Sequence, residues 1–241
     1  MAKALVLNVA IDVITMNEAL QQIKLFIAMR QPRLIATANA EMVMLAQSDK
    51  QLADILAAAD MVLPDGAGVV WAARYTGQPM PERVAGYDLV QRLLAEAVVH
   101  GYRLYFFGGA PGVADKAKEV AQKRYPGVQV VGTRHGYFSA ADEPAIIADI
   151  KAARPDILLV ALGVPKQEKW LAAHLNELQV PVAIGVGGTF DVMAGLVPRA
   201  PVWMQKIGLE WLFRLLCQPS RFGRMLALPR FVLCVMSSKK G

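Results

Sequence analysis

The chain has 241 residues, of which 55% are hydrophobic and 19% are charged, and its formal net charge is +6. This length allows one large domain or two small ones, and the hydrophobic content allows a substantial core, so disordered and fibrous classes of protein are excluded. The charge is uneven, because the segment from Arg199 onward holds eight basic residues against the single acid Glu210, whereas 18 basic and 19 acidic residues precede it.

In chain order, the hydrophobic periodicity predicts a strand over 5–9, a helix over 17–29, a strand over 33–37, helices over 41–45 and 50–59, a strand from 61, helices over 67–75 and 89–100, a strand over 103–107, a helix that ends at 124, a strand over 128–131, a helix over 143–153, a strand over 156–161, a helix over 167–178 and a strand over 182–186. Alternation at this spacing implies right-handed crossovers. It predicts a Rossmann-like α/β fold with a mostly parallel sheet covered by helices on both faces.

The stretch 61–88 concentrates candidate functional residues. An apolar run at 61–63 ends at Pro64, so Asp65 is expected where a buried strand gives way to a turn. Open α/β sheets place their chemistry at such edges. An Asp after a strand can equally be a helix cap, and Asn39, after an earlier strand, is open to the same two interpretations. What favours function at Asp65 is the second charged loop around Arg83.

Two glycine-rich turns follow predicted strands, at 108–112 and 185–189. Each has the setting of a phosphate-binding loop, in which backbone amides approach an anion, but each also fits a tight turn in a Rossmann-like unit. No Asp-x-Asp occurs, so the usual carboxylate pair that holds a divalent metal on a nucleotide diphosphate is missing, and the three histidines lack metal-ligand spacing. We expect no metal and no cofactor, with arginines and backbone amides neutralising any bound diphosphate.

The segment from Arg199 onward combines arginines with bulky apolar residues. Trp203, Ile207, Trp211 and Leu215 recur at helical spacing, a pattern that fits a packed core helix or an interfacial membrane segment. Its charge favours an anionic partner, most simply a membrane surface or a phosphate. No window of 18 uncharged apolar residues occurs and the N-terminal apolar run ends at Asp12, so we expect neither a spanning helix nor a signal peptide. Two cysteines without Cys-x-x-Cys spacing fit the cytoplasm.

Seven motifs are found in this order: Thr37-Ala38-Asn39, Leu63-Pro64-Asp65-Gly66, Glu82-Arg83-Val84-Ala85-Gly86-Tyr87-Asp88, His135-Gly136-Tyr137-Phe138, Leu162-Gly163-Val164-Pro165-Lys166-Gln167-Glu168, Gly185-Val186-Gly187-Gly188-Thr189-Phe190-Asp191, and Arg199-Ala200-Pro201 with Gly208-Leu209-Glu210-Trp211 and Arg214-Leu215. Together they resemble the WecG/TagA/CpsF glycosyltransferase family over nearly the whole chain, and within it the TagA-type enzymes of wall teichoic acid synthesis. One departure is Gln218 before Pro219, where the family commonly has an acidic residue.

The resemblance implies an inverting, metal-independent transfer of a sugar from a UDP-sugar donor to N-acetylglucosamine on a polyprenyl diphosphate. N-Acetylmannosamine is the expected sugar, before its uronic acid or a hexose. The reaction would occur at the cytoplasmic, inner face of the cell membrane, with the chain bound peripherally to an anionic membrane surface. Residues 1–198 would form the α/β body, and 199–241 a basic appendage that completes the site and contacts the membrane. No nucleic acid partner is implied, and a homo-oligomer is left open.

The resemblance also implies site roles. Asp65 would be the catalytic base. Arg83 would lie beside the departing diphosphate. The other substrate-binding positions that match the family are Thr37, Asn39, Tyr137, Gln167, Arg214, Arg221 and Arg224. The alternatives are a non-catalytic nucleotide- or lipid-binding protein, in which Asp65 and Asn39 are caps and the tail is only an anchor, and a Rossmann-type dehydrogenase, against which the incomplete glycine fingerprint argues.

Overall fold

The computed structural model describes residues 2–219 and 222–238, apart from the side chain of Arg224. Its elements are β1 (Lys3–Val6), β2 (Val9–Asp12), α1 (Met16–Met29), β3 (Arg33–Ala38), α2 (Ala40–Ala46), α3 (Lys50–Ala58), β4 (Met61–Pro64), α4 (Ala67–Tyr75), α5 (Gly86–His100), β5 (Arg103–Gly108), α6 (Val113–Arg124), β6 (Gln129–Arg134), the 3-10 turn η1 (Ala140–Asp142), α7 (Glu143–Ala153), β7 (Ile157–Ala161), α8 (Lys166–Leu178), β8 (Val182–Gly185), α9 (Thr189–Met193), α10 (Val202–Lys206), α11 (Glu210–Cys217), α12 (Phe222–Met225) and α13 (Ala227–Ser238).

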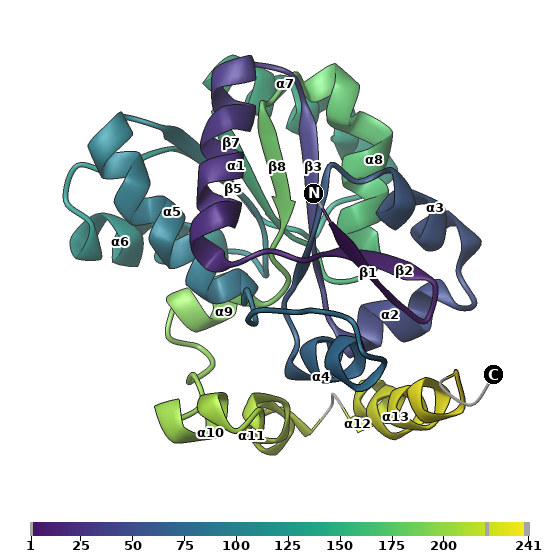
Figure 1. Cartoon of the computed structure of the whole chain (residues 1–241). Helices are drawn as coiled ribbons and strands as arrows, with labels where there is room; N and C mark the ends of the chain where they lie inside the picture. Colours follow the sequence, from purple (N-terminus) through teal and green to yellow (C-terminus); the bar gives the residue numbers. More distant parts are fainter. Residues whose placement is uncertain (1, 220–221, 239–241) are drawn as a thin grey trace.

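The centre of the molecule is a sheet of six described strands in the order β4-β3-β8-β7-β5-β6 (Figure 1). Every neighbouring pair in it is parallel. Helices cover both faces, as a parallel sheet requires, because its strands are apolar on both sides. The predicted Rossmann-like α/β fold is therefore confirmed.

Alternation along each strand divides the buried residues into two cores. Leu34, Ala36 and Ala38 of β3 face one core, whereas Ile35 faces the other. The first core takes its helical residues from α2, α3, α4, α7, α8 and α13, and the second from α1, α5, α6 and α9. The helices that follow the adjacent strands β3 and β8 therefore lie on opposite faces. Their loops diverge, which opens a crevice at the carboxyl ends of the strands.

The first predicted strand, at 5–9, is wrong. The chain instead makes an antiparallel hairpin of β1 and β2, turning at Leu7 and Asn8. Both turn residues have positive φ, 46° and 67°, as a two-residue hairpin turn with the twist of its strands requires. The hairpin is joined to the sheet by the buried Asp12, whose Oδ2 accepts a hydrogen bond of 2.7 Å from the Val62 amide of β4.

The interpretation of the Trp203 stripe as core is wrong as well. Trp203 and Ile207 are each 60% exposed, and Trp211 is also exposed. The stripe is interrupted between α10 and α11, where Gly208 has a φ of 77°, a left-handed conformation that ends a helix. The described residues from 199 onward therefore form a series of separate helices, and these run past the carboxyl ends of the strands (Figure 1).

The last described helix, α13, is where this segment packs into the body. Phe231 and Val235 are each only 1% exposed, and both belong to the core that α2 and α4 also line. They lie one helical turn apart, so one face of α13 is buried while Leu233 on another face is exposed. The segment is thus fixed to the body at its far end as well as at its start.

Candidate active site

Two cavities meet at the carboxyl edge of the sheet. The larger has a volume of about 430 Å³ and the smaller about 170 Å³. Both are lined by Asn39, Glu41, Asp65, Val186 and Arg214. These shared residues come from the ends of β3, β4 and β8, from α2 and from α11, so they form the junction between the two cavities.

The larger cavity is built mostly from loops that follow strands. Its walls contain Gly109 after β5, Gly163 after β7, and Gly187 and Gly188 after β8. The predicted residues Thr37, Tyr137 and Gln167 line it too, with Tyr137 71% exposed. Both glycine-rich turns of the sequence analysis thus contribute backbone to one cavity, the arrangement that suits an anionic or nucleotide ligand.

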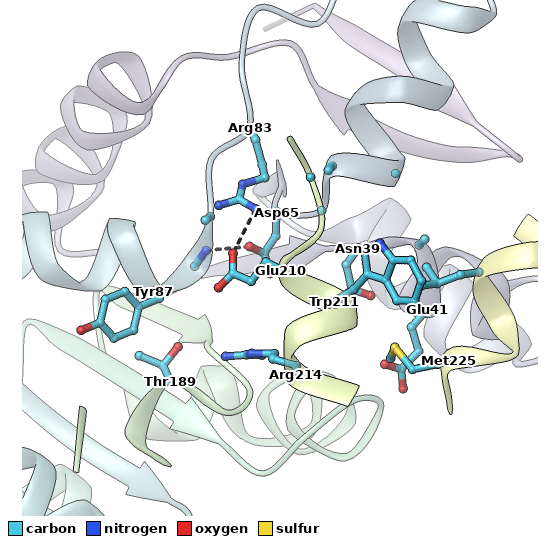
Figure 2. A pocket seen from close by; sticks show the side chains of 18 of the residues that line it. Asn39, Glu41, Asp65, Arg83, Tyr87, Thr189, Glu210, Trp211, Arg214 and Met225 are labelled. Atoms are coloured by element: carbon cyan, nitrogen blue, oxygen red, sulfur yellow. Dashed lines mark hydrogen bonds and ion pairs between the residues drawn. The ribbon is translucent and has the colours of Figure 1, made fainter. Parts of the chain in front are cut away.

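The smaller cavity is closed on one side by the C-terminal segment, meaning the described residues from Arg199 onward. That side consists of Gly208, Glu210, Trp211, Arg214, Met225 and Leu228. The opposite side comes from the body and includes Arg83 and Tyr87. Figure 2 shows Arg214 and Trp211 on α11 extending toward the body residues of this cavity. Its lining combines arginines with bulky apolar side chains.

Asp65 lies at the junction, directly after β4, as the sequence predicted. Its Oδ1 accepts a hydrogen bond of 2.9 Å from the amide of Gly86, the first residue of α5. Burial raises the pKa of the Asp65 carboxyl, while the Gly86 hydrogen bond and the charges of Arg83 and Arg214 act in the opposite direction. A carboxylate with a raised pKa is a stronger base, which suits it to accept a proton.

Thr37, Asn39 and Gln167 each use one polar atom to bind the backbone. The Thr37 hydroxyl donates to the Gly185 carbonyl at 2.8 Å, and the Asn39 Oδ1 accepts from the Met42 amide at 3.0 Å, capping α2. The Gln167 Oε1 accepts from the Gly187 amide at 3.0 Å. The cap interpretation of Asn39 is therefore correct as far as Oδ1 goes. What these contacts leave is an acceptor on Thr37 and amide donors on Asn39 and Gln167.

Glu168 is a buried acid that the sequence analysis did not single out. It is 1% exposed, and its Oε1 accepts a hydrogen bond of 2.7 Å from the Nε2 of Gln167. Its Oε2 is buried without a hydrogen-bond partner among the described residues. Burial raises the pKa of Glu168 to about 7, although the Gln167 hydrogen bond acts in the opposite direction.

Arg83 faces the C-terminal segment through an ion pair. Its Nη1 lies 3.1 Å from the Oε2 of Glu210 on α11, as Figure 2 shows. Glu210 Oε1 in turn lies 3.7 Å from the Nε of Arg199, whose guanidinium makes two hydrogen bonds of 2.6 Å to Asp88. This network links the segment to the body beside Asp65. Sequence reasoning missed Glu210, although its being the only acid after Arg199 was a usable signal.

Other candidates lie elsewhere or have structural roles. Glu82, which neighbours Arg83, accepts from the Met16 amide at the start of α1. Arg224 belongs to α12, and Arg221 lies outside the described residues. Among the residues that the structure describes, no group of three or more His, Cys, Asp or Glu side chains is arranged to hold a metal ion.

A Rossmann-like sheet with a carboxylate, two arginines and glycine-rich loops at its carboxyl edge has the arrangement in which open α/β enzymes place their substrates. The family described as "Glycosyl transferase WecG/TagA/CpsF family" matches residues 4–241, and the chain belongs to this family of glycosyltransferases. The resemblance found in the sequence motifs is thereby confirmed.

Several relatives share the name N-acetylglucosaminyldiphosphoundecaprenol N-acetyl-beta-D-mannosaminyltransferase. That of Bacillus subtilis (strain 168) is 36% identical over 86% of this chain and 80% of its own length. The Bacillus spizizenii protein is 37% identical, covering 86% of this chain and 79% of the relative. The Staphylococcus aureus (strain NCTC 8325 / PS 47) protein is 33% identical over 99% of this chain and 94% of its own length.

Proposed function

We propose that the chain transfers N-acetylmannosamine from a UDP-sugar to the N-acetylglucosamine of a polyprenyl-diphosphate acceptor, with inversion at the sugar and without a metal ion. The observation that carries the proposal is the position of Asp65, a carboxyl of raised pKa at the junction of two cavities and in the field of two arginines. The names of the relatives supply the acceptor and the transferred sugar.

The larger cavity is assigned to the UDP-sugar and the smaller to the lipid-linked acceptor. Glycine-rich loops in the larger cavity suit a nucleotide diphosphate, and Trp211, Met225 and Leu228 beside the smaller one suit the start of a lipid. The free amide donors of Asn39 and Gln167 suit the carbonyl oxygen of an acetamido group. Thr37, which is left with an acceptor, suits a sugar hydroxyl.

In this mechanism the second oxygen of Asp65 takes the proton of the acceptor hydroxyl as that hydroxyl's oxygen attacks the anomeric carbon. The bond from this carbon to UDP breaks on the opposite face, and UDP leaves with the bonding electrons. Arg214, which lines both cavities, stabilises the charge that grows on the UDP diphosphate, a role that Arg221 and Arg224 would share. Arg83 lines the smaller cavity and would act on the same charge where the two cavities meet at Asp65. For Arg83 this requires an exchange, because the diphosphate must displace Glu210 from it.

The C-terminal segment is also proposed to dock on an anionic membrane at the cytoplasmic face. Its exposed Trp203, Ile207 and Phe222 can enter the headgroup boundary while basic residues meet lipid phosphates. In the described part of the chain, no helix has the length and apolar character needed to cross a bilayer. Binding to phosphatidylglycerol vesicles should weaken as salt rises, and a Trp203→Ser variant should bind more weakly at every salt concentration; salt-independent binding would contradict the docking proposal.

The function is tested by incubating the chain with a panel of UDP-sugars and a short-chain lipid diphosphate of N-acetylglucosamine, with products detected by mass. The expected result is transfer from UDP-N-acetylmannosamine, with an α-to-β change at the anomeric carbon seen by NMR, and equal turnover with excess EDTA. Retention of configuration would refute the mechanism. Loss of turnover in EDTA that Mg²⁺ or Mn²⁺ restores would refute metal independence.

A further inference from the structure

Gln167, in the wall of the larger cavity, belongs to a chain of hydrogen bonds that also includes Glu168, a residue without a role in the proposed mechanism. The Gly187 amide donates to the Oε1 of Gln167, and the Nε2 of Gln167 donates to the Oε1 of Glu168. Gln167 and Glu168 are each 1% exposed. They are the second and third residues of α8, and Gln167 lines the cavity.

These contacts fix which way the Gln167 amide faces. An amide can in principle be turned over, exchanging its oxygen and its nitrogen. Here the oxygen accepts from the Gly187 backbone amide, which only an acceptor can do, and the nitrogen donates to the Oε1 of Glu168. One hydrogen of Nε2 is thereby used, and the other is left for a ligand in the cavity.

The backbone of β8 passes close to the side chains of Gln167 and Glu168. Gly185, at the end of β8, has no side chain, and a β-carbon there would lie 2.6 Å from the Nε2 of Gln167 and 3.0 Å from the Oε1 of Glu168. The carbonyl of the same glycine accepts the Thr37 hydroxyl. Two predicted sugar-binding side chains are therefore set by one short piece of backbone.

Glu168 lies in the first turn of α8, and the groups that lower its pKa are the Gln167 side-chain amide and its own backbone amide. No described Lys, Arg or His side chain acts on its pKa, and its Oε2 has no hydrogen-bond partner in the described residues. A buried, unpaired carboxyl is costly to the fold, so an apolar residue would serve packing better at this position. A role for the Glu168 oxygen in holding the Gln167 amide would explain why a buried carboxyl is kept at this position.

We propose that Glu168 is a positioning residue that orients the Gln167 amide, so that a fixed N–H donor points at the transferred sugar. The proposal rests on the proposed function in that it assigns the sugar to this cavity. It predicts that Glu168 acts through Gln167 alone and needs an acceptor oxygen, not a charge, at this point.

The main experiment is a double-mutant cycle with the full chain, using Glu168→Met, Gln167→Met and the double variant. Methionine keeps roughly the length of either side chain and removes its hydrogen bonds. Glu168→Met should lower kcat/KM for UDP-N-acetylmannosamine by about ten- to hundredfold, as expected when a buried donor loses its partner. The Kd for UDP, which lacks the sugar, should stay within about threefold of that of the parent chain. In the Gln167→Met background, adding Glu168→Met should change kcat/KM by less than about twofold, because coupled residues are not additive.

Glu168→Gln is the matched control, since its amide oxygen can still accept from Gln167. It should retain kcat/KM within about threefold of that of the parent chain. A loss of tenfold or more in Glu168→Gln with an unchanged melting temperature would overturn the proposal. So would equal effects of Glu168→Met in both backgrounds, or a parallel loss of UDP affinity. Because Glu168→Gln removes a buried charge without changing shape, it tests the proposal even if the methionine variant does not fold.

A second measurement does not depend on turnover. In a ¹⁵N–¹H spectrum, the Gln167 side-chain amide is the pair of signals that disappears in Gln167→Met. One of its two protons should shift upfield in Glu168→Met and remain near its original position in Glu168→Gln. An unchanged pair in Glu168→Met would refute the link between the residues. If no UDP-sugar is turned over by the parent chain, the proposed function fails, while this spectrum still decides whether Glu168 orients Gln167.

Discussion

The two cavities at the carboxyl edge of the sheet are built in different ways. The larger is lined by loops that follow parallel strands, and only Arg214 reaches it from the described part of the C-terminal segment. The smaller exists only because α11, α12 and α13 lie across the body, and its far wall includes Trp211 and Met225. One cavity is therefore a property of the α/β fold, and the other is a property of how a terminal segment packs on it.

The two cavities therefore depend on different parts of the molecule. The larger needs the sheet and its glycine-rich turns, whereas the smaller also needs two attachments of the segment. One is the ion-pair network of Arg83, Glu210 and Arg199, and the other is the burial of Phe231. Ligand binding in one cavity can thus be lost while the other stays intact, unless the change affects the residues that they share.

The largest effect is expected for a shared residue. Asp65→Asn should lower kcat by about two to four orders of magnitude, the range for losing a general base, because both substrates still bind and no proton acceptor remains. Turnover is measured with UDP-N-acetylmannosamine and a short-chain acceptor, and UDP affinity by calorimetry. Near-normal turnover in a folded Asn variant would remove Asp65 from the base role.

The second effect would open the smaller cavity alone. Phe231→Ala removes a buried aromatic ring from the core beneath α13, a change that typically costs about 3–5 kcal/mol. Because that cost falls on the attachment of the segment, α13 should lose protection in hydrogen exchange while UDP still binds. Leu233→Ala, on the exposed face of the same helix, is the control and should leave both measurements unchanged. Loss of UDP affinity in Phe231→Ala would show that the cavities are not independent.

The third effect concerns the buried wall of the larger cavity. The pKa of Glu168 is raised from 4.5 to about 7, so its contribution to stability is complete below pH 4.5 and is lost as the pH rises through 7. Glu168→Gln lacks this titration. Relative to the parent chain it should gain up to about 3 kcal/mol in unfolding free energy between pH 5 and pH 8. Denaturant unfolding at both values measures this, and an identical pH dependence in the two proteins would contradict it.

The smallest effect compares two arginines of the segment. Arg214 lines both cavities, so Arg214→Ala should lower kcat/KM on a soluble acceptor by about ten- to hundredfold. Arg230→Ala removes the same charge from an exposed position on α13 and should leave that value unchanged. If the two variants lose activity equally, the effect is one of overall charge and not of position.

The alternating strands and helices, and the position of Asp65 after β4, could be predicted from the sequence because the apolar runs are long and end in proline or glycine. The hairpin at Leu7 and Asn8 could not, since its two strands merge into one apolar run unless the turn is recognised. The break at Gly208 was missed for a related reason: residues at helical spacing looked continuous across it. The Arg83–Glu210 pair joins residues 127 positions apart and could be learned only from the structure.

Gly185 offers a way to alter the protein by engineering. A methyl group at its α-carbon would collide with the ends of the Gln167 and Glu168 side chains and not with a strand. The sheet could therefore stay in place while the amide is pushed to a new position. Substitutions at residue 185, combined with compensating changes at 167, are thus a starting point for changing which sugar the enzyme accepts.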